Sequence, residues 1–315
     1  MSVQASQPKQ GDGRGPAALQ SSALVINPSA AQGVRYRSPW RDFVRRYARH
    51  RLAVVATVIV LVLALVAATA SFATPYDPHK QDYGALLQPP SAAHWLGTDD
   101  LGRDSLSRVM LGSQVSLAAG LVSVGLALAL GLPLGLLAGF RRGWWDDVIM
   151  RITDAFQSFP FLILALAIAA VLGPGAINGM IAIGVGFTPG FVRLVRGQVL
   201  AQREQEYVLA ARTVGVPELR LLGMHILPNI MAPILVQASL AVAAAIIAEA
   251  GLSYLGLGVQ PPMPSWGSML RIAQGYLTTA PWLAVWPGAA IFVAVLSINL
   301  VGDGLRDVLD PRLRQ

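Results

Sequence analysis

Five strongly apolar stretches of the chain each run for 20 or more residues without a charged side chain. They are residues 52–72, 113–140, 155–192, 226–248 and 282–301. A helix needs roughly 20 apolar residues, at 1.5 Å each, to cross the hydrocarbon core of a bilayer. The 38-residue stretch 155–192 has room for two such helices, and Gly173-Pro174-Gly175 divides it where a helix does not continue. The sequence therefore predicts an all-α, polytopic membrane protein with six transmembrane helices.

The composition argues against a water-soluble enzyme. Only 13% of the 315 residues are charged, whereas about 25% are charged in a soluble globular protein. The chain contains no cysteine, which excludes disulfides, thiolate zinc sites, Fe–S clusters and cysteine nucleophiles. Residues 1–34 are rich in Ser, Gln, Ala, Gly and Pro and show no apolar period. They are expected to form a disordered cytoplasmic tail.

The first apolar stretch, 52–72, is interpreted as a membrane span rather than a cleaved signal peptide. Ala68-Thr69-Ala70 imitates a cleavage site. However, the 51 residues before the stretch and its own 21 residues both exceed what a signal peptide contains.

Basic residues are distributed unevenly between the segments that connect the spans. With the N-terminus in the cytoplasm, 20 of the 24 Lys and Arg lie on the cytoplasmic side, and Lys80, Arg103, Arg108 and Arg271 lie outside. Short cytoplasmic loops carry an excess of Lys and Arg, so both termini are predicted to be cytoplasmic. The seven Arg between residues 35 and 51 then indicate orientation and lipid-headgroup contact rather than a nucleic-acid site.

The second span carries a regular row of glycines. Gly131, Gly135 and Gly139 recur every four residues and therefore share one helix face. Such small-residue rows let helix backbones approach closely in lipid. We expect this face to pack against another span.

Charged residues within the spans are predicted to be structural. The third span is expected to begin near Val148, which places Arg151 and Asp154 three residues apart on one helix face as an ion pair. Glu249 lies near the outer end of the fifth span and is expected to bond helix ends or another subunit. It lacks the neighbouring acids that a proton relay uses.

The sequence contains no recognised catalytic or nucleotide-binding motif. No lysine is followed by Ser or Thr, so a phosphate loop is absent, as are HExxH, GxSxG and the DxDxDG calcium loop. Acidic and histidine side chains do gather in the outer segment 73–112. Their spacing suits a metal poorly, so solvated loop acids are the more ordinary interpretation. The residues concerned are Asp77, His79, Asp82, His94, Asp99, Asp100 and Asp104.

The cytoplasmic loop 193–228 is the most informative connecting segment. Its sequence predicts a short helix through Ala210 and Ala211 that stops at Gly215, with a second helix beginning at Pro217. Two adjacent alanines form a surface that another protein can approach closely. The alternative is a plain surface hairpin between two spans.

This loop resembles the "EAA" loop of bacterial ABC importer permeases. The shared pattern is Ala-Ala, three residues, Gly215 and then Ile226-Leu227-Pro228, with Glu206 four residues before the first alanine as in the peptide branch. The resemblance implies a coupling helix that binds in a groove of a separate ATPase subunit.

Three further stretches resemble the dipeptide/oligopeptide/nickel permease family, in particular its DppC/OppC-type subunit. They begin with His94-Trp-Leu-Gly97, Glu249-Ala-Gly251 and Asn299-Leu-Val-Gly302, and with the loop they cover most of residues 75–312. The resemblance implies a type I ABC importer transmembrane domain. Its segments would be an N-terminal helix with an extracytoplasmic segment at 35–110 and a permease domain at 111–315.

The resemblance also implies partners and roles. The chain would be one of two homologous permeases in a bacterial inner membrane, working with two ATPases and an extracytoplasmic solute-binding protein. ATP and Mg would bind the ATPases, and this chain would bind no cofactor or metal. Candidate solutes are dipeptides, oligopeptides, glutathione-like peptides, nickel chelates and opines. The residues implied in ATPase coupling are Glu206, Tyr207, Ala210, Ala211, Arg212, Gly215, Pro217 and Leu222. The structural or gating candidates are Asp99, Gly102, Arg103, Asp104, Arg151, Asp154, Glu249 and Asp303.

Two other classes of membrane protein remain as alternatives. A proton-coupled secondary transporter would need several carboxylates or histidines within the membrane and usually more spans, whereas only Asp154 and Glu249 are available. A non-transporting scaffold subunit is the other alternative. Purification of the chain with its neighbours would separate these classes.

Overall fold

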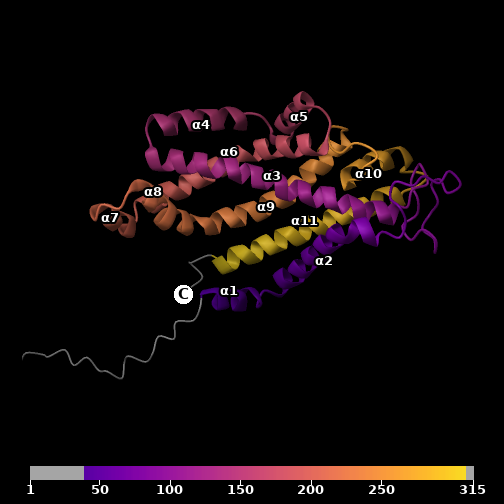
Figure 1. Ribbon diagram of the computed structural model, residues 1–315, viewed down its shortest axis with the longest axis horizontal. Coiled ribbons are helices and arrows are strands. Elements are labelled where there is room, and N and C mark those ends of the chain that lie inside the picture. Colours follow the sequence, from indigo (N-terminus) through magenta and orange to yellow (C-terminus); the bar gives the residue numbers. More distant parts are fainter. Residues whose placement is uncertain (1–38, 310–315) are drawn as a thin grey trace, which may run out of the picture. The chain divides into compact units, whose positions relative to one another are not determined.

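The computed structural model describes residues 39–309, and the predicted disordered tail 1–34 lies outside them. The described chain is helical, and within it the only β pairing is an isolated bridge between Thr98 and Asp104. A π-helical turn, Leu221–Ile226, precedes α9, and a 3-10 turn, Gln274–Tyr276, follows α10. The helices (Figure 1) are α1 Pro39–Tyr47, α2 Arg51–Ala73, α3 Ser105–Arg141, α4 Trp144–Gln157, α5 Phe161–Leu172, α6 Ala176–Arg203, α7 Glu206–Thr213, α8 Glu218–Arg220, α9 Leu227–Tyr254, α10 Trp266–Ala273 and α11 Trp282–Leu309.

Five of the predicted spans are present as helices long and apolar enough to cross a membrane. They are α2, α3, α6, the continuous segment Glu218–Tyr254 and α11. The predicted third span differs from expectation, because α4 and α5 are bent by 92° at a short break. Pro160 accounts for the break, since its ring and missing N–H do not fit inside a helix. If α4 and α5 together form the sixth span, that span is broken in the middle.

The spans run alternately between two ends of the described chain. In Figure 1 the segment α7–α8 lies at one end with the start of α4, and α10 lies at the other end with the loop 74–104. The helix α6 extends through Arg193 and Arg196 to Arg203. The first part of the predicted loop 193–228, up to Arg203, is therefore helical and belongs to α6. Charged residues fit in this helix because they have partners on neighbouring elements, described below.

The glycine row of α3 packs on α6, as predicted. A Cβ added to Gly131, Gly135 or Gly139 would lie 2.6–2.8 Å from the Cβ of a residue on α6. The α6 residues met in this way are Phe191, Val195 and Val199, which also recur every four positions. The two helix backbones therefore approach as closely as a small-residue row allows.

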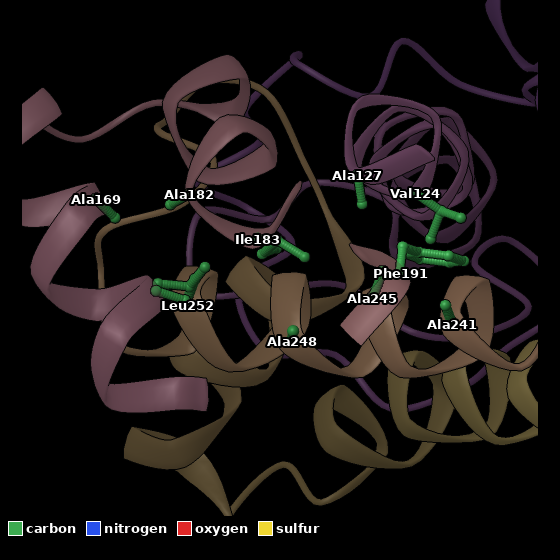
Figure 2. Close-up of a cluster of buried hydrophobic side chains, with 11 residues drawn as sticks. Val124, Ala127, Ala169, Ala182, Ile183, Phe191, Ala241, Ala245, Ala248 and Leu252 are labelled. Carbon is green, nitrogen blue, oxygen red and sulfur yellow. The ribbon is translucent and has the colours of Figure 1, made fainter. Parts of the chain in front are cut away.

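A buried apolar cluster joins α3, α5, α6 and α9, and Figure 2 shows its side chains. Small residues predominate on α9, where Ala241, Ala245 and Ala248 face the cluster. Ile183 and Phe191 of α6 fill the space that these alanines leave. This cluster fixes α6 and α9, the two helices between which the segment with α7 and α8 is held.

Candidate functional site

The segment between α6 and α9 forms a hairpin of two short helices, α7 and α8. The first ends as predicted: Gly215 has φ +79°, a left-handed conformation that non-glycine residues adopt at a cost of about 1 kcal/mol or more. Pro217 caps the start of α8. The π turn then passes into α9, so α8 and α9 are continuous. We call residues 204–222 the coupling hairpin.

One face of α7 is anchored in the protein. Val208 is fully buried against Val199 of α6 and Leu221 and Ile226 of the π turn, and Ala211 packs beside it. Ala210, by contrast, is exposed. The two adjacent alanines therefore have different roles, since one packs inward and the other belongs to the outer surface.

Polar contacts also fasten the hairpin to the helices beside it. The Tyr207 hydroxyl donates to Gln202 Oε1 at 2.6 Å and accepts from Asn229 Nδ2 at 3.2 Å. Arg203 donates to the main-chain carbonyl of Phe140 at 2.8 Å, and the Arg212 guanidinium lies 5.6 Å from the Phe140 ring centroid. The ends of α3, α6 and α9 are thereby linked to α7.

The outer face of the hairpin carries large exposed apolar side chains among its charged ones. Leu209, Val214 and Leu219 are 47–87% exposed, and Met224 in the adjoining π turn is 71% exposed. Glu206 and Pro217 are also exposed, and Leu222 is partly buried. None of these four apolar residues is among the predicted coupling residues. The available signal was the presence of large apolar side chains in a loop that is otherwise polar.

At the opposite end, the candidates Asp99, Arg103 and Asp104 form a buried charged cluster. Arg103 Nε lies 2.7 Å and Arg108 Nε 3.3 Å from the Asp99 carboxylate. Asp104 caps α3 by accepting from the Ser107 N–H, and it lies 2.9 Å from His94 Nδ1. Asp99 and Asp104 are 5% and 4% exposed. The interpretation as solvated loop acids is therefore wrong for Asp99 and Asp104, because each is enclosed with a cationic or N–H partner. It holds for Asp77, His79 and Asp82, which are exposed.

Two neighbours complete this cluster. Burial, followed by the charge of Asp99, raises the pKa of Asp100 above its ordinary value. Gly102 has φ +72°, and a Cβ there would overlap the main chain of Asp82. A glycine is therefore required where the loop passes over itself.

The predicted ion pair between Arg151 and Asp154 is wrong. Asp154 instead accepts from Arg193 of α6 at 2.7 Å, and both side chains are more than half exposed. One turn further along α6, Arg196 forms a two-pronged pair with Asp146. These partners are preferred because α4 lies along α6, which brings its acidic face within reach of the arginines.

Glu249 is buried among helix ends. Its carboxylate accepts from Ser116 of α3 at 3.1 Å and from Ser253 of α9 at 2.7 Å. Ser116 in turn accepts from the Trp266 N–H at the start of α10. This arrangement links three helices. Asp303 of α11, the last candidate, is exposed, and its side chain makes no hydrogen bond or ion pair within the described residues.

The chain matches two protein-family models. Residues 131–315 match the binding-protein-dependent transport system inner membrane component, and residues 38–90 match the N-terminal TM domain of oligopeptide transport permease C. The first match spans more than half of the chain. The chain belongs to this family. It is a multi-pass inner-membrane permease of an ABC importer, and its family consists of transport permeases rather than enzymes.

Curated relatives resemble the permease over nearly its whole length. The glutathione transport system permease protein GsiD of Pectobacterium atrosepticum is 46% identical over 279 residues, which cover 88% of this chain and 93% of the relative. The protein of the same name from Escherichia coli O157:H7 is also 46% identical, with 88% and 92% covered.

Solved structures share the fold. Two inward-facing conformations of the MetNI methionine ABC transporter match with TM-scores of 0.54 and 0.56 at 20% and 19% identity. Each match covers 65% of the permease and 96% or 97% of the other chain. The predicted type I importer fold is thereby confirmed.

Proposed function

We propose that this permease forms half of the pathway of an ATP-driven importer for short peptide-like solutes. The GsiD relatives are named for glutathione transport, and residues 38–90 match a domain named for oligopeptide transport. Glutathione is itself a short peptide, so both names indicate one chemical class. Glutathione is therefore the first solute to test.

We infer that ATP is hydrolysed on separate subunits that bind the coupling hairpin. The observation that carries this inference is the contrast between the two faces of the hairpin. Its inner face is fixed by Val208 and Tyr207, whereas its outer face exposes Leu209, Val214 and Leu219. Exposed apolar side chains close together on a short hairpin are what a protein contact site requires. The complete importer would hold a second homologous permease, two ATPases with ATP and Mg, and a solute-binding protein.

Movement in the ATPases would reach the spans through the anchored face of the hairpin. Because Val208 and the π turn share one buried cluster with α6 and α9, displacement of the hairpin moves both helices. The pathway between the two permeases would then open alternately outward and inward. The hairpin, and with it both termini, would lie in the cytoplasm, since most basic residues are on that side.

Reconstitution of the purified complex tests this function. The permease is co-expressed with its genomic neighbours, purified through a tag and placed in proteoliposomes. We expect ATPase subunits to co-purify and glutathione uptake to require both ATP and the binding protein. Uptake driven by a proton gradient alone would favour a secondary transporter. Absence of both the ATPase and uptake would favour a scaffold subunit.

A further inference from the structure

The break between α4 and α5 leaves backbone polar groups without partners. Among the hydrogen bonds of the described residues, the main-chain carbonyls of Gln157, Ser158 and Phe159 accept none, and the Gln157 carboxamide makes none. All three residues are exposed. A bilayer core offers no hydrogen bonds, so such groups occur at membrane depth only where protein or water meets them.

The break lies near the middle of the neighbouring span. Phe161, the first residue of α5, stacks on Phe187 of α6 with ring centroids 4.4 Å apart, and a Cβ on Gly186 would lie 2.9 Å from its ring. Gly186 is the eleventh of 28 residues in α6. At 1.5 Å per residue the break is roughly 15 Å from that helix end, about half the thickness of a bilayer core.

A cavity opens at the break. Its volume is about 340 Å³, and aromatic side chains from α4, the break and α5 line it together with glycines of α6. Phe156, Phe159 and Phe161 contribute aromatic side chains, while Gln157 adds a polar group. Gly190 leaves the α6 wall open, because a Cβ there would meet no atom within 4 Å.

A charged pair lies on the same face of α6, between the cavity and the Arg203 end of the helix. Arg193 lies three residues after Gly190 and therefore on the same face of α6. Its guanidinium bonds Asp154 at 2.7 Å, and the two side chains remain 53% and 57% exposed. By the same count Arg193 is roughly 25 Å from the start of α6, so the pair brings water to the end of this face nearest the interface.

We propose that the cavity at the α4–α5 break is a contact site for the transported solute on the water-filled pathway. The phenylalanine rings contact the apolar parts of a peptide-like solute. The free carbonyls and the Gln157 carboxamide oxygen accept hydrogen bonds from its N–H and ammonium groups. The class of solute in this assignment rests on the proposed function, whereas the location of the site rests on the structure.

Cysteine labelling tests whether the break meets water. The chain has no native cysteine, so Ser158→Cys introduces a single thiol into it. In the complete importer we expect a charged, water-soluble methanethiosulfonate to label this thiol. Gly125→Cys of α3 is the control, since its side chain also enters open space, and it should stay unlabelled. Failure to label Ser158→Cys means that another protein surface covers the break and overturns the site, as does equal labelling of the control.

A substitution that fills the cavity tests contact with the solute. Gly190→Leu should reduce uptake of labelled glutathione at least about tenfold, because an added side chain displaces the solute, while ATPase co-purification is unchanged. Gly125→Leu should leave uptake intact. Normal uptake by Gly190→Leu overturns the site alone. If the unsubstituted importer takes up neither glutathione nor a dipeptide, the peptide-like solute is wrong for both the proposed function and this site.

Discussion

Single residues in this permease are most constrained where the chain turns or where charge is enclosed. Gly215 adopts a left-handed conformation at the end of α7, and Asp104 both caps α3 and pairs with His94. The first requirement was predictable, because a helix that ends before a Gly-x-Pro sequence commonly uses glycine in this way. The second was not, because sequence spacing does not reveal which loop acids become buried.

Gly215→Val is predicted to weaken ATPase binding without preventing membrane insertion. No atom would clash with the added Cβ, so the effect is backbone strain of about 1–2 kcal/mol that reorients α8 relative to α7. Co-purification of the ATPase and its permease-dependent hydrolysis measure the effect. Gly215→Asn is the control, because asparagine tolerates this conformation. Normal ATPase retention and transport by Gly215→Val would contradict the prediction.

At the scale of helices, close packing of α3 on α6 supports the rest of the fold. The glycine row of α3 receives Phe191, Val195 and Val199, and α6 then holds α4 through the pair between Arg196 and Asp146. This packing was predictable from the four-residue period of the glycines. The identity of the partner helix was not predictable, because a row of small residues indicates close contact but does not indicate which span makes it.

Gly135→Ala is predicted to destabilise the permease. The new Cβ would lie 2.6 Å from that of Val195, and such overpacking costs about 1–3 kcal/mol. Thermal unfolding of the detergent-purified complex provides the measurement. Gly125→Ala on the same helix meets open space and should unfold at or above the original temperature. Equal stability of the two variants would argue against tight packing of α3 on α6.

The bend of the third span was not predicted from the sequence. The apolar stretch predicted one helix that ends before Gly173-Pro174-Gly175, whereas Pro160 within the stretch was the signal for the 92° break. The ion pair of Asp154 was misassigned for a related reason. A partner three residues away is visible in the sequence, whereas Arg193 becomes a neighbour only after α4 packs along α6.

For the whole molecule, the alternation of the spans and the positions of basic residues support the proposed orientation, with the coupling hairpin in the cytoplasm. The apolar stretches were sufficient to predict a polytopic helical fold, and the sequence of the segment between α6 and α9 was sufficient to predict ATPase binding there. The exposed apolar residues of that hairpin became apparent only in three dimensions, because the sequence alone does not separate them from its buried ones.

This orientation predicts which end of the permease is accessible from outside the cell. Trp95 lies in the loop 74–104 and Val214 directly follows α7, and they are 70% and 79% exposed. The loop 74–104 and α7 lie at opposite ends of the described chain (Figure 1). In spheroplasts an impermeant maleimide should label Trp95→Cys, and it should label Val214→Cys only after the membrane is permeabilised. The reversed pattern would invert the topology and exclude ATPase binding at the hairpin.

The enclosed charges of the loop 74–104 have a consequence for docking. Ion pairs fasten this loop, which we call the rim, to the start of α3. They join Asp99 to Arg103 and Arg108, and Asp104 to His94. A protein that lands on this rim meets a surface that is already ordered. When such a protein binds, the permease therefore loses little conformational entropy. Binding then depends on shape complementarity rather than on folding of the loop upon contact.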